Sequence, residues 1–240
     1  MKEQSLQFCG LRFSGLAKDA ILESPEPFQQ VVTVGAEFII EAHRNERFRR
    51  IIDANVATFD GQVPYAIARR KHPGRAFEKI SGADFIYDVC ARARERGERI
   101  FLLGGYAQSN AGSVETMRAM GIEADGMVTG FIPYPFPQDR LEQIRERIRS
   151  FAPSYLFVGL GMCKQEYFID ENRDFLAACG VRIAVGSGGT FEVFSGMIRR
   201  APVWMQRAGL EGLYRVLSEP NFKRFKRLAS TLKFLKYINR

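Results

Sequence analysis

The sequence has few of the residues on which disulfide scaffolds and metal enzymes depend. Its four cysteines form no Cys-x-x-Cys pair, and only two histidines, His43 and His72, occur in 240 residues. Disulfide frameworks and structural zinc sites need closely spaced cysteines, whereas catalytic zinc sites and Ser-His-Asp triads need histidine. We therefore expect reduced thiols, no metal centre and no serine-hydrolase triad.

Long apolar runs are also missing. No uninterrupted apolar stretch approaches the ~20 residues that span a bilayer. The segment Met1-Lys2-Glu3-Gln4-Ser5 lacks the basic stretch and apolar core of a signal peptide. The sequence therefore predicts a protein that is neither exported nor membrane-spanning.

The C-terminal end lacks acidic residues. After Glu219 there is no Asp or Glu, whereas seven Lys or Arg residues follow, in a chain of net charge +8. Apolar residues recur among them every three or four positions: Phe222, Phe225, Leu228, Leu232, Leu235 and Ile238. This pattern is typical of a helix at a membrane interface, where each basic residue contributes on the order of 1 kcal/mol. A terminal helix packed in the core would show the same spacing. Nucleic acid would attract the same charge, but no nucleic-acid-binding motif accompanies it.

The rest of the chain alternates between strand-like and helix-like segments. Apolar runs occur at residues 31–34, 56–59, 99–103, 155–158 and 181–185, and helical periods at 38–52, 83–96, 111–120, 141–151 and 165–178. Such alternation predicts an α/β, Rossmann-like fold, with a mostly parallel sheet and helices on both faces. We expect a core at residues 1–195 and a basic, amphipathic helical appendage at residues 196–240.

Several of the apolar runs lead directly into glycine-containing turns. These turns are Asp60-Gly61, Gly104-Gly105, Gly159-Leu160-Gly161 and Gly186-Ser187-Gly188-Gly189. Ligands of open α/β sheets bind at the carboxyl ends of the strands, so we expect the four turns to line one cleft. The Pro/aromatic segment 131–137 either overhangs this cleft or packs as a surface loop.

Two of these turns suit a phosphate-containing ligand. Gly104-Gly105 allows a phosphate or a ribose to approach backbone N–H groups at a helix start, although it is not the Gly-x-Gly-x-x-Gly of nicotinamide enzymes. After Gly161, Lys164 and Gln165 open a helix, where they suit a diphosphate or a sugar hydroxyl. A structural interpretation is that Lys164 is solvated and Glu166 caps the helix.

Asp60 is the carboxylate best placed to act as a base. It directly follows the predicted strand 56–59 and precedes Gly61. A carboxylate at the ligand edge can accept a proton from an attacking hydroxyl, and desolvation there moves its pKa towards a useful range. Asp-Gly pairs also serve commonly as turns or helix caps, and composition does not distinguish the two roles.

Read together, the motifs resemble the WecG/TagA/CpsF family of bacterial glycosyltransferases. The similarity keeps its order through nearly the whole chain and includes Phe8-Cys9-Gly10, Asp60-Gly61, Ser81-Gly82-Ala83-Asp84, Phe101 to Gly105, Val158 to Glu166, Gly188-Gly189-Thr190-Phe191, Arg200-Ala201-Pro202 and Gly209-Leu210-Glu211. The resemblance implies transfer of a sugar from a UDP donor to an undecaprenyl-diphosphate-linked acceptor, with inversion, in surface-polysaccharide synthesis.

The resemblance also assigns roles to single residues. Asp60 matches the catalytic base, and Thr33 and Gln165 match substrate-contacting positions. Further substrate-binding assignments are Gly35, Gly104, Gly105, Lys164, Gly188, Glu192, Arg200 and Arg215. The residues expected to associate with the membrane are Phe222, Lys223, Arg224, Phe225, Lys226 and Arg227.

Many transferases hold a divalent metal with an Asp-x-Asp motif, which this chain lacks. Arg200, Arg215 and Lys164 would instead stabilise the leaving diphosphate. We therefore expect a metal-independent enzyme without a cofactor, in the cytoplasm at the inner face of the cell membrane. Its expected partners are the UDP-sugar, the polyprenyl-diphosphate-linked acceptor and the anionic membrane surface, and not nucleic acid. The sequence is also compatible with a homo-oligomer.

The chain departs from the family pattern at several positions. Gly35 stands in place of an asparagine, Cys163 in place of a proline, Glu192 in place of an aspartate and Gly212 in place of a tryptophan. Loss of the asparagine removes a side-chain donor and acceptor, so the donor contacts are expected to differ. The alternative function is a non-catalytic nucleotide-sugar-binding or scaffold protein of a membrane assembly complex.

Overall fold

A computed structural model of the chain describes residues 5–208, 210–218 and 232–239. The chain groups into two compact units. Unit 1 comprises Met1–Lys18, Thr33–Ser81 and Arg199–Arg240, and unit 2 comprises Asp19–Val32 and Gly82–Ile198. No helix in the described part of the chain is long and apolar enough to cross a bilayer.

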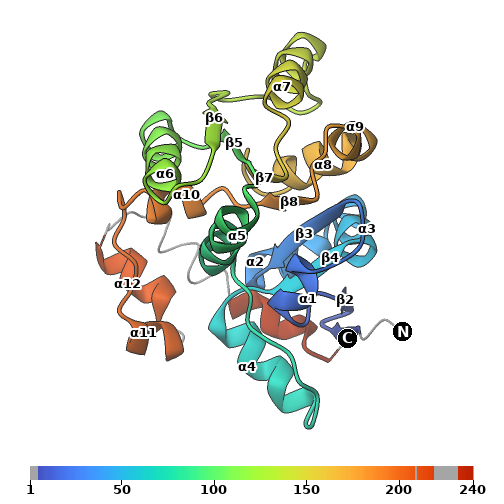
Figure 1. Cartoon of the computed structure of the whole chain (residues 1–240). Helices are drawn as coiled ribbons and strands as arrows, with labels where there is room; N and C mark the ends of the chain where they lie inside the picture. The colour runs from blue at the N-terminus through green and yellow to red at the C-terminus, as the bar shows by residue number, and fades with distance from the viewer. Residues whose placement is uncertain (1–4, 209, 219–231, 240) are drawn as a thin grey trace. The chain divides into compact units, whose positions relative to one another are not determined.

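Six strands form a parallel sheet in the order β4-β3-β8-β7-β5-β6 (Figure 1). They are β3 (Gln29–Val34), β4 (Val56–Phe59), β5 (Ile100–Gly104), β6 (Ala124–Met127), β7 (Tyr155–Gly159) and β8 (Ile183–Gly186). Every residue of β5 and β8 is buried, because helices on both faces of a parallel sheet exclude water from both sides of a strand. The predicted α/β, Rossmann-like fold is confirmed.

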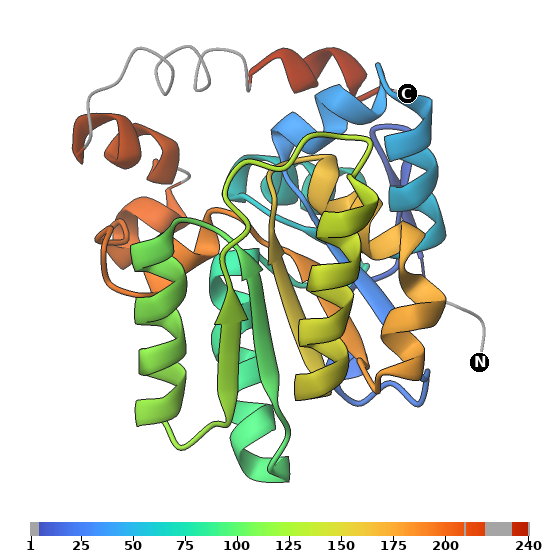
Figure 2. The same ribbon diagram turned by 90° about the horizontal axis from the view of Figure 1, so that it is seen from above.

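The helices of unit 2 cover the strands on both sides. They are α5 (Gly82–Arg96), α6 (Ala107–Ala119), α7 (Gln138–Phe151), α8 (Lys164–Glu171), α9 (Arg173–Ala178) and α10 (Thr190–Phe194), and α1 (Lys18–Leu22) precedes them. Figure 2 shows α5 and α7 on opposite faces of the unit 2 strands. α7 buries Leu141, Ile144 and Ile148, which recur at helical spacing. It ends at Ala152, whose φ of 46° stops the helix.

Unit 1 holds the remaining elements. These are β1 (Leu6–Phe8), β2 (Leu11–Phe13), α2 (Ala36–Ala42), α3 (Glu46–Ala54), α4 (Gln62–Lys71), α11 (Val203–Arg207), α12 (Glu211–Ser218) and the 3₁₀ helix η1 (Leu232–Tyr237). The rings of Phe13 and Phe59 stack with their centroids 4.0 Å apart, so the β1–β2 hairpin packs on β4.

Polar side chains divide two helices that the sequence predicts as continuous. The predicted helix 38–52 is α2 and α3, because the side chain of Asn45 accepts a hydrogen bond from Phe48 N (3.1 Å) and starts a new helix. The predicted helix 165–178 is α8 and α9, with Asn172 between them. Asn172 Nδ2 donates to Phe168 O (2.7 Å) and its Oδ1 accepts from Arg145 Nε (2.9 Å).

The β1–β2 hairpin and β6 are not among the elements predicted from the sequence. The hairpin turns at Cys9 and Gly10, with φ values of 52° and 68°. Two residues with positive φ suit a tight hairpin turn, but a cysteine in the first of these positions is not a typical turn signal. β6 has the sequence Ala-Asp-Gly-Met, which lacks the apolar run of the other strands.

The C-terminal segment is described only from residue 232 to residue 239. In η1, Phe234 is buried, while Leu232 and Leu235 are exposed. η1 lies against α2, and the ring of Tyr237 stacks on His43 with the centroids 4.0 Å apart. The expected membrane-associating residues Phe222, Lys223, Arg224, Phe225, Lys226 and Arg227 lie outside the described residues. The division between residues 1–195 and 196–240 stays a prediction.

Candidate active site

Three strands of unit 2 end in glycine at the same edge of the sheet. β5, β7 and β8 end at Gly104, Gly159 and Gly186, and the register pairs Gly104 with Gly159. The N–H of Gly105 donates to Gly159 O over 2.9 Å. A Cβ at Gly104 would lie 2.6 Å from the same carbonyl oxygen, so a side chain there would separate the turns. Three of the four glycine turns predicted to share an edge therefore do so within unit 2.

α10 packs against this edge through Phe191. A Cβ at Gly105 would lie 2.6 Å from Phe191 Cδ2, so the ring fills the space beside the glycine. Ser113 Oγ on α6 donates to Phe191 O (3.1 Å) and fixes the helix. This packing places Glu192, one of the predicted substrate-binding residues, on a helix that begins directly after Gly188-Gly189.

Gln165 and Glu166 form a buried polar pair at the end of β8. Gln165 Nε2 donates to Glu166 Oε1 (2.8 Å), and Glu166 Oε2 accepts from the backbone N–H of Cys163 (2.8 Å). A Cβ at Gly186 would lie 2.4 Å from Glu166 Oε1, so the pair occupies space that glycine leaves free. Gln30 on β3 adds a second buried side-chain amide, whose Nε2 donates to Glu166 O (3.0 Å).

Burial controls the charge of Glu166. Its side chain is 1% exposed, and the resulting desolvation raises its pKa to about 7. Hydrogen bonds from Gln165 and from two backbone N–H groups act in the opposite direction and lower the pKa. From the sequence, Glu166 is interpreted only as a helix cap. The bond from Cys163 N confirms the cap, but burial that raises a pKa depends on tertiary packing and leaves no signal in a local motif.

The side chain of Lys164 contacts the Pro/aromatic segment 131–137. Its Nζ donates to Ile132 O (2.8 Å) and lies 4.5 Å from the centroid of the Phe131 ring. The Phe131 side chain is 86% exposed. The segment 131–137 therefore contacts the start of α8, beside the glycine edge.

Unit 1 brings together three of the predicted residues at the ends of β3 and β4. Thr33 is buried on β3, and Gly35 is the N-cap of α2. The N–H of Asp60 donates to Val34 O (3.1 Å), and a Cβ at Gly35 would lie 3.6 Å from Asp60 O. Asp60 is half-buried, and Gly61 after it has a φ of 87°, a conformation that favours glycine.

The sequence matches the glycosyl transferase WecG/TagA/CpsF family over residues 6–240. The chain belongs to this family. Membership makes it a glycosyltransferase and implies, in general, a nucleotide-sugar donor and a lipid-linked acceptor.

A partial match to a solved structure is the crystal structure of RecJ in complex with Mn²⁺ from Thermus thermophilus. The identity is 17% and the TM-score 0.29, and the match covers 67% of this chain and 22% of that chain. The chain therefore spans about a fifth of the RecJ chain, and a likeness of this size supports no argument about function.

One departure from the WecG/TagA/CpsF pattern has a structural consequence. Cys163, which stands where the resemblance leads us to expect proline, has a φ of 69°. Proline is fixed near a φ of about −65° and has no N–H, so it can neither adopt this conformation nor donate to Glu166. The start of α8 in this WecG/TagA/CpsF protein is therefore built for a residue other than proline.

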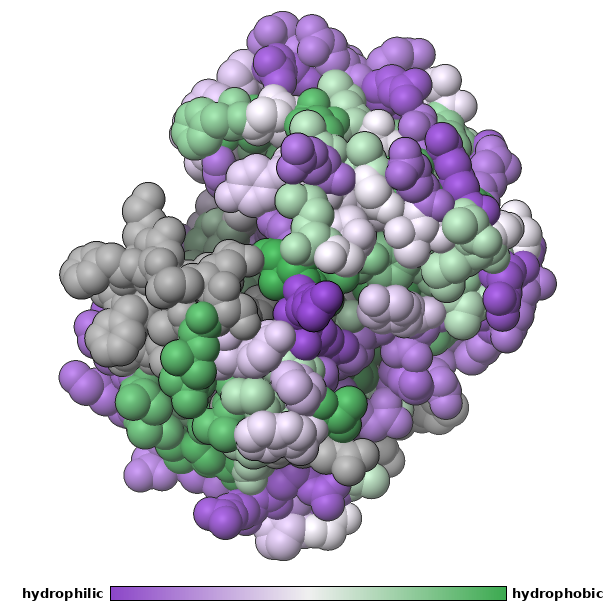
Figure 3. Space-filling model, turned by 90° about the vertical axis from the view of Figure 1, so that its left-hand side faces the viewer, coloured by the Kyte–Doolittle hydropathy of each residue, from purple (hydrophilic) through white to green (hydrophobic). Residues whose placement is uncertain are grey.

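The arginines assigned to the diphosphate lie in the C-terminal part of unit 1. Arg200 Nε lies 3.8 Å from Glu211 Oε1. Arg215 belongs to α12, and its side chain lies outside the described part of the chain. α11, α12 and Leu210 between them leave apolar side chains exposed (Figure 3), namely Val203, Trp204, Leu210, Leu213 and Leu217.

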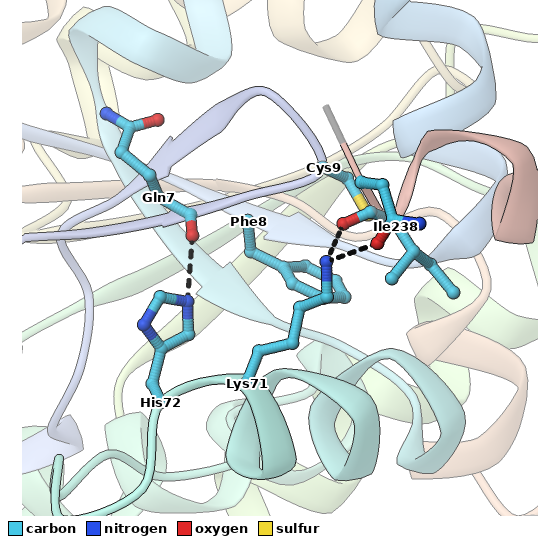
Figure 4. A pocket seen from close by; sticks show the side chains of 7 residues that line it. Gln7, Phe8, Cys9, Lys71, His72 and Ile238 are labelled. Atoms are coloured by element: carbon cyan, nitrogen blue, oxygen red, sulfur yellow. Dashed lines mark hydrogen bonds between the residues drawn. The ribbon is translucent and has the colours of Figure 1, made fainter.

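Unit 1 also contains a cavity of about 430 Å³ between the β1–β2 hairpin, the end of α4 and the C-terminal residues (Figure 4). Lys71 Nζ donates to Ile238 O and Asn239 Oδ1, and His72 Nε2 donates to Gln7 O (2.9 Å). None of the predicted catalytic or substrate-binding residues lines this cavity. Among the residues that the structure describes, no three His, Cys, Asp or Glu side chains are grouped so that they could hold a metal ion.

Proposed function

We propose that this chain is an inverting, metal-independent glycosyltransferase. It moves a hexose or an N-acetylhexosamine from a UDP-sugar to an undecaprenyl-diphosphate-linked acceptor, in the synthesis of a surface polysaccharide of the exopolysaccharide, capsule or teichoic acid type. The family match over residues 6–240 supports the transferase class. The observation that carries the substrate assignment is the glycine edge of unit 2, with Gln165 buried beside it.

The donor is assigned to unit 2. α6 begins at Ala107, one residue beyond Gly104-Gly105, and its N-cap residue Tyr106 makes no side-chain capping hydrogen bond. N–H groups at such a helix start lack partners within the helix, and the helix dipole favours negative charge there, so they suit phosphate oxygens. In the proposal the donor diphosphate binds at this turn and the donor sugar contacts Gln165.

Asp60 is the proposed base. Its carboxylate accepts the proton of the acceptor hydroxyl as the hydroxyl oxygen attacks the anomeric carbon. The bond from that carbon to the diphosphate oxygen breaks, UDP leaves, and the new glycosidic bond has the inverted configuration. The family resemblance assigns Thr33 to substrate binding. Gly35, whose backbone lies near Asp60 in unit 1, is a further proposed substrate-binding residue, at the position of the family asparagine.

Positive charge from the protein stabilises the departing diphosphate in this proposal. Arg200, Arg215 and Lys164 are assigned to that role, and no Asp-x-Asp motif is present in the sequence to hold a metal ion. Lys164 has the closest link to the glycine edge, because it opens the same helix as Gln165.

The lipid-linked acceptor lies in a membrane, so the enzyme must reach the membrane surface. The proposal assigns this role to the C-terminal segment at the inner face of the cell membrane. The acid-free sequence after Glu219 and the exposed apolar residues of α11 and α12 support it.

A transfer assay tests the proposal. Purified protein is incubated in EDTA with a panel of UDP-sugars and a short-chain polyprenyl-diphosphate-sugar acceptor, and wild type is compared with Asp60→Asn. We expect transfer from one donor by wild type and none by the variant. Activity that EDTA abolishes and magnesium or manganese restores would contradict metal independence. Bound UDP-sugar without transfer would favour the non-catalytic alternative.

A further inference from the structure

The Gln165–Glu166 pair contains an atom that the proposed reaction leaves unexplained. The Gln165 side chain is 4% exposed, and its Oε1 has no hydrogen-bond partner within the described ranges of the chain. Buried acceptors are rarely left without a donor, because they lose their bonds to water on folding. An acceptor of this kind beside a ligand edge indicates that the ligand supplies the donor.

Ionised Glu166 fixes the orientation of the Gln165 amide. The Nε2 group donates to Glu166 Oε1 over 2.8 Å. If the amide turned over, its carbonyl oxygen would face a carboxylate oxygen, and no proton would lie between the two acceptors. The carbonyl of Gln165 must therefore point away from Glu166 while the carboxyl group is ionised.

A glycine leaves room in front of that carbonyl. A Cβ at Gly188 would lie 3.3 Å from Gln165 Oε1 and 3.7 Å from Gly159 Cα. Because residue 188 has no side chain, a ligand atom can occupy this position within reach of the oxygen. The turns after β7 and β8 border the same position.

We propose that Glu166 is a positioning residue for the donor, orienting Gln165 so that its carbonyl oxygen accepts a hydrogen bond from a hydroxyl of the donor sugar beside Gly188. The identity of the ligand as a UDP-sugar rests on the proposed function. A hydroxyl is specified because the oxygens of a sugar-linked diphosphate carry no proton at neutral pH and cannot donate to a carbonyl.

Protonation of Glu166 reverses the orientation. A protonated carboxyl group donates to Gln165 Oε1, so the amide turns and presents its NH₂ group instead. The pKa of Glu166 is raised to about 7 by burial. Three groups face the carboxyl group: the Gln165 amide, the N–H of Cys163 at the start of α8, and the backbone of Gly186 at the end of β8. Gln30 of β3 donates to the backbone carbonyl of Glu166. None of these groups is charged.

The first arm of the test measures binding of the full chain by calorimetry. The probes are UDP-glucose, UDP-N-acetylglucosamine and analogues of each in which one sugar hydroxyl is replaced by fluorine, which cannot donate. For wild type at pH 8 we expect one fluorinated analogue to bind about tenfold more weakly than its parent. Gln165→Met removes the acceptor, so parent and analogue should then bind equally.

The second arm varies pH. Between pH 8 and pH 6 the ionised fraction of Glu166 falls to about a tenth, so wild-type affinity for the parent UDP-sugar should fall roughly tenfold. Glu166→Gln keeps the size of the side chain and an acceptor for Cys163 N, but it accommodates both amide orientations. Its affinity at pH 8 should be roughly twofold to fivefold weaker and should not change with pH. Its unfolding free energy at pH 8 should not be lower than that of wild type, whereas a merely structural role would lower it.

A third variant changes neither Gln165 nor Glu166. Gly188→Ala places a methyl group in the ligand position, so donor affinity should fall about tenfold while the unfolding free energy stays near that of wild type. Unchanged donor affinity would overturn the inference.

The outcomes separate this inference from the proposed function. If wild type binds no UDP-sugar, the donor class of the proposed function is wrong. If wild type binds a UDP-sugar equally at pH 6 and pH 8, or if Gln165→Met keeps the fluorine penalty, the positioning role is wrong and the proposed function stands.

Discussion

Two carboxylates follow strand ends in this chain, and their surroundings differ. Asp60 in unit 1 is half-buried directly after β4, whereas Glu166 in unit 2 is 1% exposed on α8. Asp60 stands at a turn, where its sequence position alone suggests a base. Glu166 has a raised pKa because the fold removes it from water. A strand-end position therefore identifies a candidate base from the sequence, whereas the raised pKa of Glu166 follows from burial, which only the fold reveals.

The largest expected effect concerns Asp60. Replacing a general base removes a path for the acceptor proton, so Asp60→Asn should lower kcat by about 10³-fold while donor affinity stays within roughly twofold. Transfer kinetics and calorimetry measure the two quantities. Asp139→Asn, an exposed change at the start of α7, is the matched control and should keep wild-type activity. An equal loss of kcat in Glu166→Gln would break the proposed division of roles.

A second prediction concerns the cap of α8. Cys163→Pro should lower the free energy of unfolding by about 3 kcal/mol, because proline cannot adopt a φ of 69° and removes the N–H that donates to Glu166 Oε2. Cys163→Ala keeps the N–H and should cost much less. Urea unfolding of both variants measures the difference. A proline variant as stable as wild type would mean that the start of α8 adopts another conformation.

A third prediction concerns the glycine beneath the polar pair. Gly186→Ala should lower the free energy of unfolding by about 2 kcal/mol and weaken donor binding, because its Cβ would lie 2.4 Å from Glu166 Oε1 and 2.8 Å from Gln165 Nε2. Gly189→Ala is the matched control, since a Cβ there meets no atom within 4 Å and the φ of −84° suits alanine. If the two variants had the same unfolding free energy and donor affinity, the side chains of Gln165 and Glu166 would have to move away from the added methyl group without cost.

The sequence predicts the framework of this protein better than its polar interior. The five strands that were predicted are apolar runs whose burial follows from composition, and the glycine turns follow from their ends. β6 has no such run, and the division of α2 from α3 depends on a single cap at Asn45. Motifs suggest Asp60 and Gln165 as candidates, but the contact between Gln30 and Glu166 joins residues 136 positions apart and cannot be read from local spacing.

The last prediction concerns the pH dependence of stability, and it tests the burial of Glu166 without any ligand. The folded-state pKa is raised from 4.5 to about 7, so the folded protein binds a proton more tightly than the unfolded chain. The stabilisation is complete below the unfolded pKa and is lost as pH rises through the folded pKa. Relative to Glu166→Gln, which has no carboxyl group to titrate, wild type should lose about 2 kcal/mol of unfolding free energy between about pH 5.5 and pH 8. Urea unfolding of both proteins at the two pH values measures this difference. A difference that stays constant would mean that the Glu166 carboxyl group is solvated in the folded protein. A difference that grows with pH in favour of wild type would mean that a positive charge stabilises the carboxylate.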